Sequence, residues 1–208
     1  KTSIITPVPK VPTPNSCSDF RPISVTPIMS RLLEKLLVRK YLYPILSDPI
    51  ASHKFNDQFA FRPTGSTTAA LIHLFQKITE LLLIYPYVHV ISLDFSKAFD
   101  TVRHSTLIDT LAELPIPAQV HNWIVNYLSS RAHCTRFRGE VSSAATINAS
   151  IVQGSGIGPM AFVINNSDLI SLHDGNLVPK YADDTCLVVP SVNTHTIQSE
   201  LEHIASWS

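Results

Sequence analysis

Glycine and long apolar runs are scarce in this sequence. Only 6 of the 208 residues are Gly, whereas 15 are Pro; average usage is roughly 7% Gly and 5% Pro. Hydrophobic residues still make up 45% of the chain, which argues against a collagen-like or disordered chain and suits one domain with a real core. The longest apolar stretch, residues 81–93, is interrupted by Pro86 and His89, so we expect no membrane-spanning segment and no membrane partner.

Cysteine is also sparse. Cys17, Cys134 and Cys186 are far apart and form no CxxC pair, which argues against a disulfide framework and against a zinc site. The N-terminal residues lack both Met and the apolar core of a signal peptide. These absences predict reduced thiols in an intracellular protein of the nucleus, the cytoplasm or both.

A net charge is missing as well, because 16 basic side chains balance 16 acidic ones. The balance conceals an asymmetry: residues 1–62 hold nine Lys or Arg and four acids, and residues 63–208 hold seven and twelve. A basic first part suits a polyanion, whereas an acidic second part would repel one unless metal ions neutralised it. Ordinary surface charge explains the same numbers equally well.

The pattern of apolar residues predicts a mixture of helices and strands. Five prolines in the first 22 residues predict an extended arm. Helical spacing, with a cap at Ser66 or Thr67, predicts helices over residues 29–46, 66–83, 106–114, 117–128, 159–170 and 196–207. Apolar and β-branched runs predict strands over residues 87–93, 134–138, 146–152, 177–181 and 185–189.

Three carboxylates lie at the ends of predicted strands. Asp94 follows the strand over residues 87–93, and Asp183 and Asp184 lie in the turn of a predicted hairpin. Crowded carboxylates raise each other's pKa, and Mg²⁺ removes that cost because it binds carboxylates together with substrate phosphates. A pair of such ions can promote an in-line displacement at phosphorus. For the Asp183–Asp184 pair taken alone, a simple turn remains the favoured reading.

The sequence motifs around these carboxylates resemble those of a known family. Three blocks occur in order: SLDFSKAFDTVRH at residues 92–104, QGSGIGP at 153–159, and YADD at 181–184. Three upstream blocks agree with them: ITPVPK at residues 5–10, DFRPIS at 19–24, and QFAFRP at 58–63. Together they resemble the reverse transcriptase of LINE-type, non-LTR retrotransposons over nearly the whole chain.

The resemblance implies an α+β fold, the fingers and palm of a right-hand polymerase, with a small antiparallel palm sheet packed on helices. Residues 1–85 would form the fingers-like part and residues 86–208 the palm, within one continuous domain. The family continues into a thumb after the palm and carries an endonuclease domain before the fingers, and we expect this sequence to lack both. The sequence is therefore expected to be a fragment of a longer polyprotein or a decayed copy, with RNA-directed DNA polymerase as its activity by resemblance.

The same resemblance assigns the metal-binding residues. Asp94 and Asp183 would bind both of two Mg²⁺ ions, with Mn²⁺ as the alternative metal. Asp184 would complete the catalytic set, helped by the backbone carbonyl of Phe95.

Further positions match residues around the incoming nucleotide. Phe99 falls where the family places the steric gate that excludes a ribose 2′-hydroxyl, although core packing would be the ordinary role of a Phe. Gln153 and Gly154 would line the nucleotide, and Gly allows the backbone to approach it closely. Tyr181 would flank the primer end, although a Tyr that begins a hairpin is often structural.

Basic residues supply candidate contacts to triphosphate and nucleic acid. Arg62 is assigned to nucleotide binding and Arg21 to primer or template. Arg131, Arg136 and Arg138 form a basic cluster without acids, which suits the nucleic-acid backbone, although a solvated hairpin face explains it nearly as well. The implied partners are an RNA template, a DNA primer and deoxynucleoside triphosphates.

Two other readings remain open. The chain could be a catalytically inactive, nucleic-acid-binding remnant, or the palm of a maturase, a telomerase or an RNA-directed RNA polymerase. A Phe at position 99 argues against an RNA product. The sequence of residues 94–104 favours a retrotransposon enzyme over a maturase or a telomerase.

Overall fold

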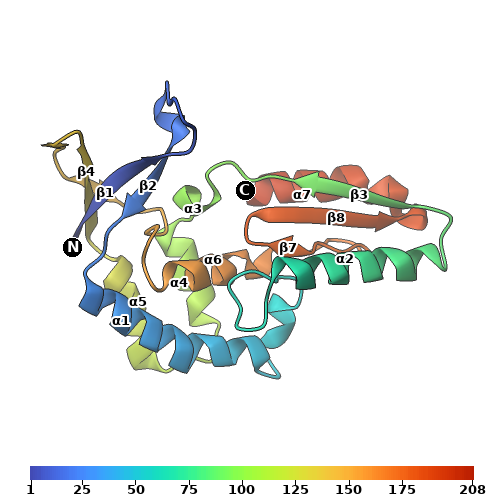
Figure 1. Cartoon of the computed structure of the whole chain (residues 1–208). Coiled ribbons are helices and arrows are strands. Elements are labelled where there is room, and N and C mark those ends of the chain that lie inside the picture. The colour runs from blue at the N-terminus through green and yellow to red at the C-terminus, as the bar shows by residue number, and fades with distance from the viewer. The chain divides into compact units, whose positions relative to one another are not determined.

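The computed structural model describes residues 1–208, which form two compact units (Figure 1). The first unit contains Lys1–Ile45 and Phe99–Ile164, and the second contains Leu46–Ala98 and Asn165–Ser208. Each unit is thus built from two separate stretches of sequence. The division predicted at residue 85 concerns polymerase subdomains rather than compact units, and it stays a prediction.

The first unit contains a sheet in the order β2-β1-β4-β5, with β6 also paired to β4. Its strands are β1 (Thr2–Pro9), β2 (Phe20–Ser24), β4 (Arg131–Phe137), β5 (Glu140–Val141) and β6 (Ala145–Ile147). Strand β1 is antiparallel to β2 and parallel to β4. The strands predicted over 134–138 and 146–152 are present, but the second is shorter and ends at Ile147.

The proline-rich start is a strand pair within this sheet, so the prediction of an extended arm was only partly right. Strand β4 pairs with β1 only along Thr2–Ile5. Pro7 and Pro9 lie beyond that pairing, and Pro7 is opposite Pro22 in β2. Proline is tolerated here because it has no N–H to donate and these positions have no second neighbouring strand.

The helical part of the first unit begins with α1 (Ile28–Leu37), which continues through a π-helical turn at Val38–Leu42. The other helices are α3 (Ala98–Thr101), α4 (His104–Ala112), α5 (Ala118–Leu128) and α6 (Gly158–Asn165). Pro159 is the second residue of α6, where its missing N–H leaves no hydrogen bond unmade. The predicted helices of this unit are confirmed, apart from one or two turns at their ends.

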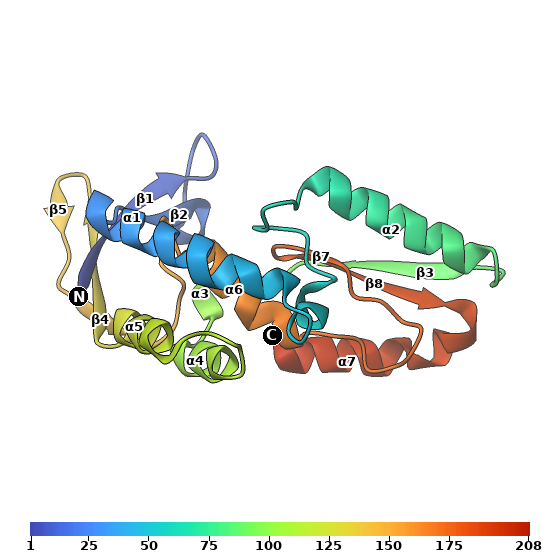
Figure 2. The ribbon, with the colours of Figure 1, turned by 90° about the horizontal axis from the view of Figure 1, so that it is seen from below.

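The second unit contains an antiparallel sheet in the order β3-β8-β7. Its strands are β3 (Val88–Leu93), β7 (Lys180–Tyr181) and β8 (Asp184–Pro190), and its helices are α2 (Thr67–Leu82) and α7 (Ile197–Trp207). The sheet lies between the two helices (Figure 2). Leu187 and Val189 of β8 form a core with Ile204 of α7. The small antiparallel sheet packed on helices is therefore confirmed.

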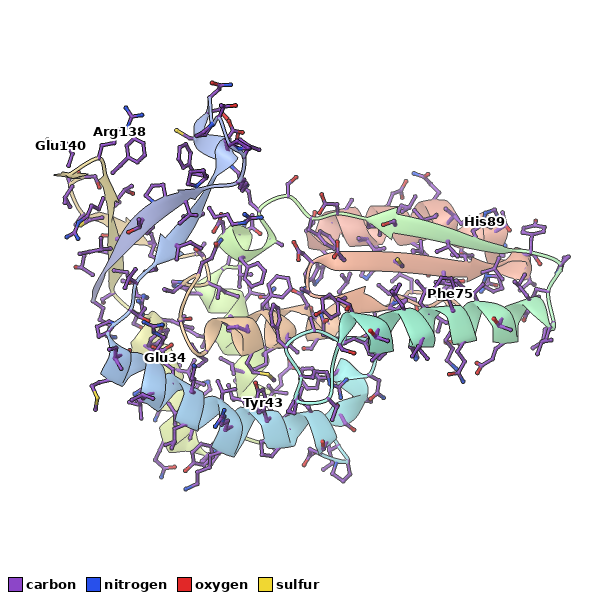
Figure 3. The ribbon with its side chains drawn as sticks, viewed as in Figure 1. Glu34, Tyr43, Phe75, His89, Arg138 and Glu140 are labelled. Atoms are coloured by element: carbon purple, nitrogen blue, oxygen red, sulfur yellow. The ribbon has the colours of Figure 1, made fainter.

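The faces that helices α1 and α2 bury differ from those that the spacing of their apolar residues predicted. In α1 the leucines Leu32, Leu33 and Leu36 are exposed, whereas Glu34 and Leu37 are buried. Helix α2 starts as predicted, because the Ser66 hydroxyl accepts a hydrogen bond from the Ala69 N–H. Its apolar residues are nevertheless largely exposed. Phe75, labelled on α2 in Figure 3, is one of them. No helix is both long and apolar enough to cross a membrane.

Candidate active site

The three predicted catalytic carboxylates lie at one end of the β3-β8-β7 sheet. Leu93, the last residue of β3, pairs with Thr185 of β8. Continuing this antiparallel register by one residue puts Asp94 beside Asp184, and Asp184 pairs with Tyr181 on its other side. Residues directly opposite each other in antiparallel strands project from the same face. The fold therefore brings together two motifs that are about ninety residues apart in the sequence.

Asp183 lies in the two-residue turn between β7 and β8, where it follows Ala182 and directly precedes Asp184. Like charges on facing residues destabilise a sheet, and an oxygen-loving divalent cation relieves that repulsion. The donor set therefore fits such a cation, although no three His, Cys, Asp or Glu side chains are gathered as closely as the ligands of a bound metal.

Phe95 follows Asp94 directly and is anchored by α7. Its ring meets that of Trp207 in α7 edge to face, with 5.7 Å between the ring centres. The Trp207 indole N–H donates to Asp168 Oδ1 at 2.9 Å. The backbone that carries the proposed Phe95 carbonyl ligand is thus held by α7, a contribution that no sequence motif indicated.

A buried lysine supports the carboxylate hairpin, and it was not among the residues predicted from the sequence. Lys180 is 1% exposed, and its ammonium group donates to the carbonyls of Asn166 and Leu169 and pairs with Asp57 Oδ2 at 2.9 Å. Burial lowers the pKa of Lys180 and raises that of Asp57, while their mutual attraction opposes both shifts. The sequence did contain one indication of this role, because Lys180 is a charged residue within an otherwise apolar predicted strand.

The glycine-rich block forms a tight loop in the first unit. The Gln153 carbonyl accepts from the Ser24 N–H at 2.8 Å, and the Gln153 amide donates to Asp100 Oδ1 at 3.1 Å. Gly154 has a φ of +104°, and a Cβ there would lie 2.4 Å from the Ser24 carbonyl oxygen. A larger residue could not occupy this position without moving β2.

Glu34 of α1 holds the same loop from the other side (Figure 3). It is fully buried, and its Oε2 accepts from the N–H groups of Gly156 at 2.6 Å and Ile157 at 3.3 Å. Ser30 donates to the other carboxylate oxygen at 2.7 Å. At Gly156 a Cβ would come within 3.0 Å of Arg31 O and Glu34 Cβ, so the loop lies directly on the helix. The spacing of the leucines in α1 did not indicate that the buried face of this helix contains Glu34.

Phe99 is the second residue of α3 and stacks on Phe162 of α6, with ring centres 4.3 Å apart and 18° between the planes. Its carbonyl accepts from the Ile151 N–H at 2.8 Å. These contacts fix the ring on a helix that is buried along nearly its whole length. They fit the packing role, and they also provide the rigid support that a steric gate needs.

The family model described as reverse transcriptase (RNA-dependent DNA polymerase) matches residues 8–208. The chain belongs to the reverse transcriptase family. The predicted resemblance to retrotransposon enzymes is also confirmed by relatives from Drosophila melanogaster. The probable RNA-directed DNA polymerase from transposon X-element is 26% identical over 91% of this chain, and the RNA-directed DNA polymerase from mobile element jockey is 27% identical over 94%. This chain spans only about a fifth of their length, 20% and 22% respectively.

Solved structures of a telomerase and of an RNA-dependent RNA polymerase share the fold of this reverse transcriptase chain. Telomerase from Candida albicans, solved with a fragment of telomeric RNA, aligns with a TM-score of 0.66 at 13% identity. The alignment covers 99% of this chain and 40% of that one. An insertion-loop deletion mutant of the RNA-dependent RNA polymerase of a human picobirnavirus aligns with a TM-score of 0.60 at 15% identity, covering 96% of this chain and 39% of that one. The predicted fingers and palm architecture is therefore confirmed.

The predicted basic residues differ in whether their side chains are bound within the protein or exposed at its surface. Arg62 Nη1 donates to the carbonyls of Phe55 at 2.7 Å and Gln58 at 3.1 Å, and partial burial lowers its pKa. Arg62 therefore organises its own loop. Arg21 is exposed on β2.

The predicted arginine cluster at β4 is divided. Arg136 and Arg138 are exposed, and Arg138 lies at the tip of the β4–β5 hairpin (Figure 3). Arg131 is 6% exposed: it donates to Ser3 Oγ at 2.8 Å and lies over the Tyr127 ring at 4.5 Å. The structure gives Arg131 an internal role and leaves two arginines at the surface.

Proposed function

We propose that this chain carries the nucleotidyl-transfer site of an RNA-directed DNA polymerase from a non-LTR retrotransposon. The substrates would be deoxynucleoside triphosphates and the 3′-hydroxyl of a DNA primer paired with an RNA template. The observation that supports this most strongly is the register of β3 and β8, which sets Asp94 beside Asp184 with Asp183 in the adjoining turn.

Asp94, Asp183 and Asp184, together with the Phe95 carbonyl, would hold two Mg²⁺ ions, or Mn²⁺ in their place. Bound there, two such ions would favour attack by the primer hydroxyl and stabilise the leaving pyrophosphate. The carboxylates themselves supply the negative charge that makes the site selective for divalent cations. Tyr181 lies beside Asp184 in the register and would flank the primer end.

The nucleotide would be recognised by residues that the fold holds rigidly. Gln153 and Gly154 would line the base and sugar, and the stacked ring of Phe99 would exclude a ribose 2′-hydroxyl. Arg62 would face the triphosphate. Exposed Arg21, Arg136 and Arg138 would contact the phosphates of primer and template, whereas Arg131 would act indirectly by fixing the base of β4.

The experiment is Mg²⁺-dependent primer extension on an RNA template by the full-length parent protein, compared with its Asp183→Asn variant. The amide keeps the size of the side chain and removes the negative charge, so extension should fall to background. The matched control is Asp109→Asn, which removes an exposed carboxylate of α4 and should leave extension unchanged. Near-normal extension by the Asp183→Asn protein would overturn the metal assignment.

The same assay on residues 1–208 separates this proposal from a binding remnant. The isolated chain should bind primer–template in a salt-sensitive way and extend it weakly, since the longer relatives carry further sequence. A parent protein that binds but never extends, under any Mg²⁺ or Mn²⁺ concentration, would favour the inactive remnant.

A further inference from the structure

A segment from the upstream QFAFRP block runs alongside the carboxylate hairpin as an additional strand position. Gln58 forms a parallel bridge with Lys180 in β7. The Lys180 N–H donates to the Asp57 carbonyl at 2.7 Å, and the Phe59 N–H donates to the Lys180 carbonyl at 2.9 Å. The backbone just before Tyr181 is therefore fixed from the side opposite β8.

The side chain of Gln58 extends this support to the turn itself. Its Oε1 accepts from the Ala182 N–H at 3.0 Å, and its Nε2 donates to the Ala182 carbonyl at 3.4 Å. Oε1 also accepts from the Ala60 N–H at 3.0 Å, which fixes the orientation of the amide. Gln58 is 2% exposed and Ala182 8%, so water has little access to replace these bonds.

The turn needs such support because of its backbone conformation. Ala182 has a φ of +57°, a left-handed conformation that a residue with a Cβ adopts only under restraint. Asp183, the next residue, carries a proposed metal ligand. A small rotation about the Ala182 backbone would displace its carboxylate relative to Asp94.

We propose that Gln58 is a positioning residue, which holds the Ala182–Asp183 turn in the geometry required for metal binding. This inference rests on the proposed function, and it adds a role for a side chain that touches neither metal nor substrate. Lys180 and Asp57 fix the strand, whereas Gln58 bonds to the turn itself with its side chain.

The test compares three substitutions that separate hydrogen bonding from packing. Gln58→Met keeps the length and volume of the side chain but removes every hydrogen bond. Gln58→Ala removes both the packing volume and the hydrogen bonds of the side chain. Gln58→Glu keeps an oxygen that can accept hydrogen bonds from the N–H groups of Ala182 and Ala60. The matched control is Gln76→Met on the exposed face of α2, where the amide bonds only to Glu80.

In the full-length parent protein, Gln58→Met should lower kcat for primer extension by about tenfold or more and leave KM for primer–template within about twofold. It should also raise the Mn²⁺ concentration needed for half-maximal activity. Gln58→Glu should recover part of the loss. A Gln58→Met protein with normal kcat and normal Mn²⁺ dependence would overturn the inference, as would equal losses in the Gln76→Met protein.

A second measurement on residues 1–208 does not require catalysis. Hydrogen exchange of the Ala182 amide should be slow in the parent chain and in Gln58→Glu, and fast in Gln58→Met. Mn²⁺ affinity can be followed through the fluorescence of Trp207, which lies against Phe95, in a Trp123→Phe background. Weaker Mn²⁺ binding in Gln58→Met, combined with no primer extension by the full-length parent protein or any of its variants, would support the role of Gln58 while overturning the proposed function. Unchanged exchange and unchanged Mn²⁺ binding would overturn the role of Gln58 alone.

Discussion

Each compact unit contains one fully buried helical glutamate that accepts hydrogen bonds from two consecutive backbone N–H groups of a loop. In the first unit Glu34 binds Gly156 and Ile157. In the second unit Glu200 of α7 binds Leu172 and His173, each at 3.0 Å. Each glutamate thus provides hydrogen-bond acceptors for backbone N–H groups of a loop that do not pair with a neighbouring strand.

The difference lies in what each loop carries. The Glu34 loop contains Gln153 and Gly154, which we propose to line the nucleotide. The Glu200 loop contains no residue proposed to touch substrate, and Glu200 is surrounded by further donors: Asn176 Nδ2 at 2.8 Å and His173 Nδ1 at 3.0 Å. Buried acids of one geometric type can therefore serve stability in one unit and the active site in the other.

The largest effect should come from Glu200→Ala, which leaves four donors without their acceptor. We expect the free energy of unfolding to fall by about 2–4 kcal/mol, because buried polar groups lose hydrogen bonds that water replaces only in part. Chemical denaturation monitored by circular dichroism measures this loss. The protein that remains folded at low temperature should keep its KM for deoxynucleotides.

The matched control for this prediction is Glu202→Ala, two residues further along α7, where the side chain is exposed and bonds only to Gln198. Its unfolding free energy should change by no more than about 0.5 kcal/mol. Equal stability losses at positions 200 and 202 would show that the buried hydrogen bonds of Glu200 are not responsible, because helix propensity favours Ala over Glu at both positions.

Neither of these acids was recognised in the sequence, although much of the fold was. The helix over residues 66–83, its cap at Ser66 or Thr67 and the YADD hairpin were predicted because local spacing and turn chemistry determine them. Glu34 was missed because a charged residue between leucines is normally on the solvent side of a helix. Its burial depends on Gly156, which is 122 residues away and supplies the backbone donor. Long-range partners of this kind leave no periodic signal.

Glu34→Gln should have a smaller effect on stability and a selective effect on function. The amide keeps the shape of the carboxylate but has only one acceptor oxygen and no charge, so we expect a loss of about 1–2 kcal/mol. Because the loop of Gln153 and Gly154 would be less firmly held, KM for deoxynucleotides in the parent protein should rise severalfold. KM for primer–template should stay unchanged.

The comparison of the two loops would fail if both glutamates affected nucleotide binding equally. Glu200→Gln is therefore measured beside Glu34→Gln in the same steady-state assay. A rise in KM for deoxynucleotides in the Glu200→Gln protein as large as that in Glu34→Gln would indicate a general loosening of the protein.

The smallest effect concerns acid stability in the second unit. Burial alone would raise the pKa of Glu200, but hydrogen bonds from Leu172, Asn176 and His173 outweigh it and hold the pKa below the ordinary value of 4.5. A carboxyl whose pKa is lower in the folded state contributes stability above its unfolded pKa and loses it as pH falls through the folded pKa. The unfolding free energy should therefore decline below about pH 5, and this decline should be shallower in Glu200→Gln, which cannot titrate there.

The imidazole of His173 complicates this measurement, because it pairs with the same carboxylate of Glu200. Denaturation at each pH is therefore repeated in a His173→Gln background, which removes the titration of the imidazole. The slope difference between the parent and the Glu200→Gln protein should persist in that background, because it arises from the carboxyl group. Parallel pH profiles for the two proteins would show instead that other acids dominate the loss of stability at low pH.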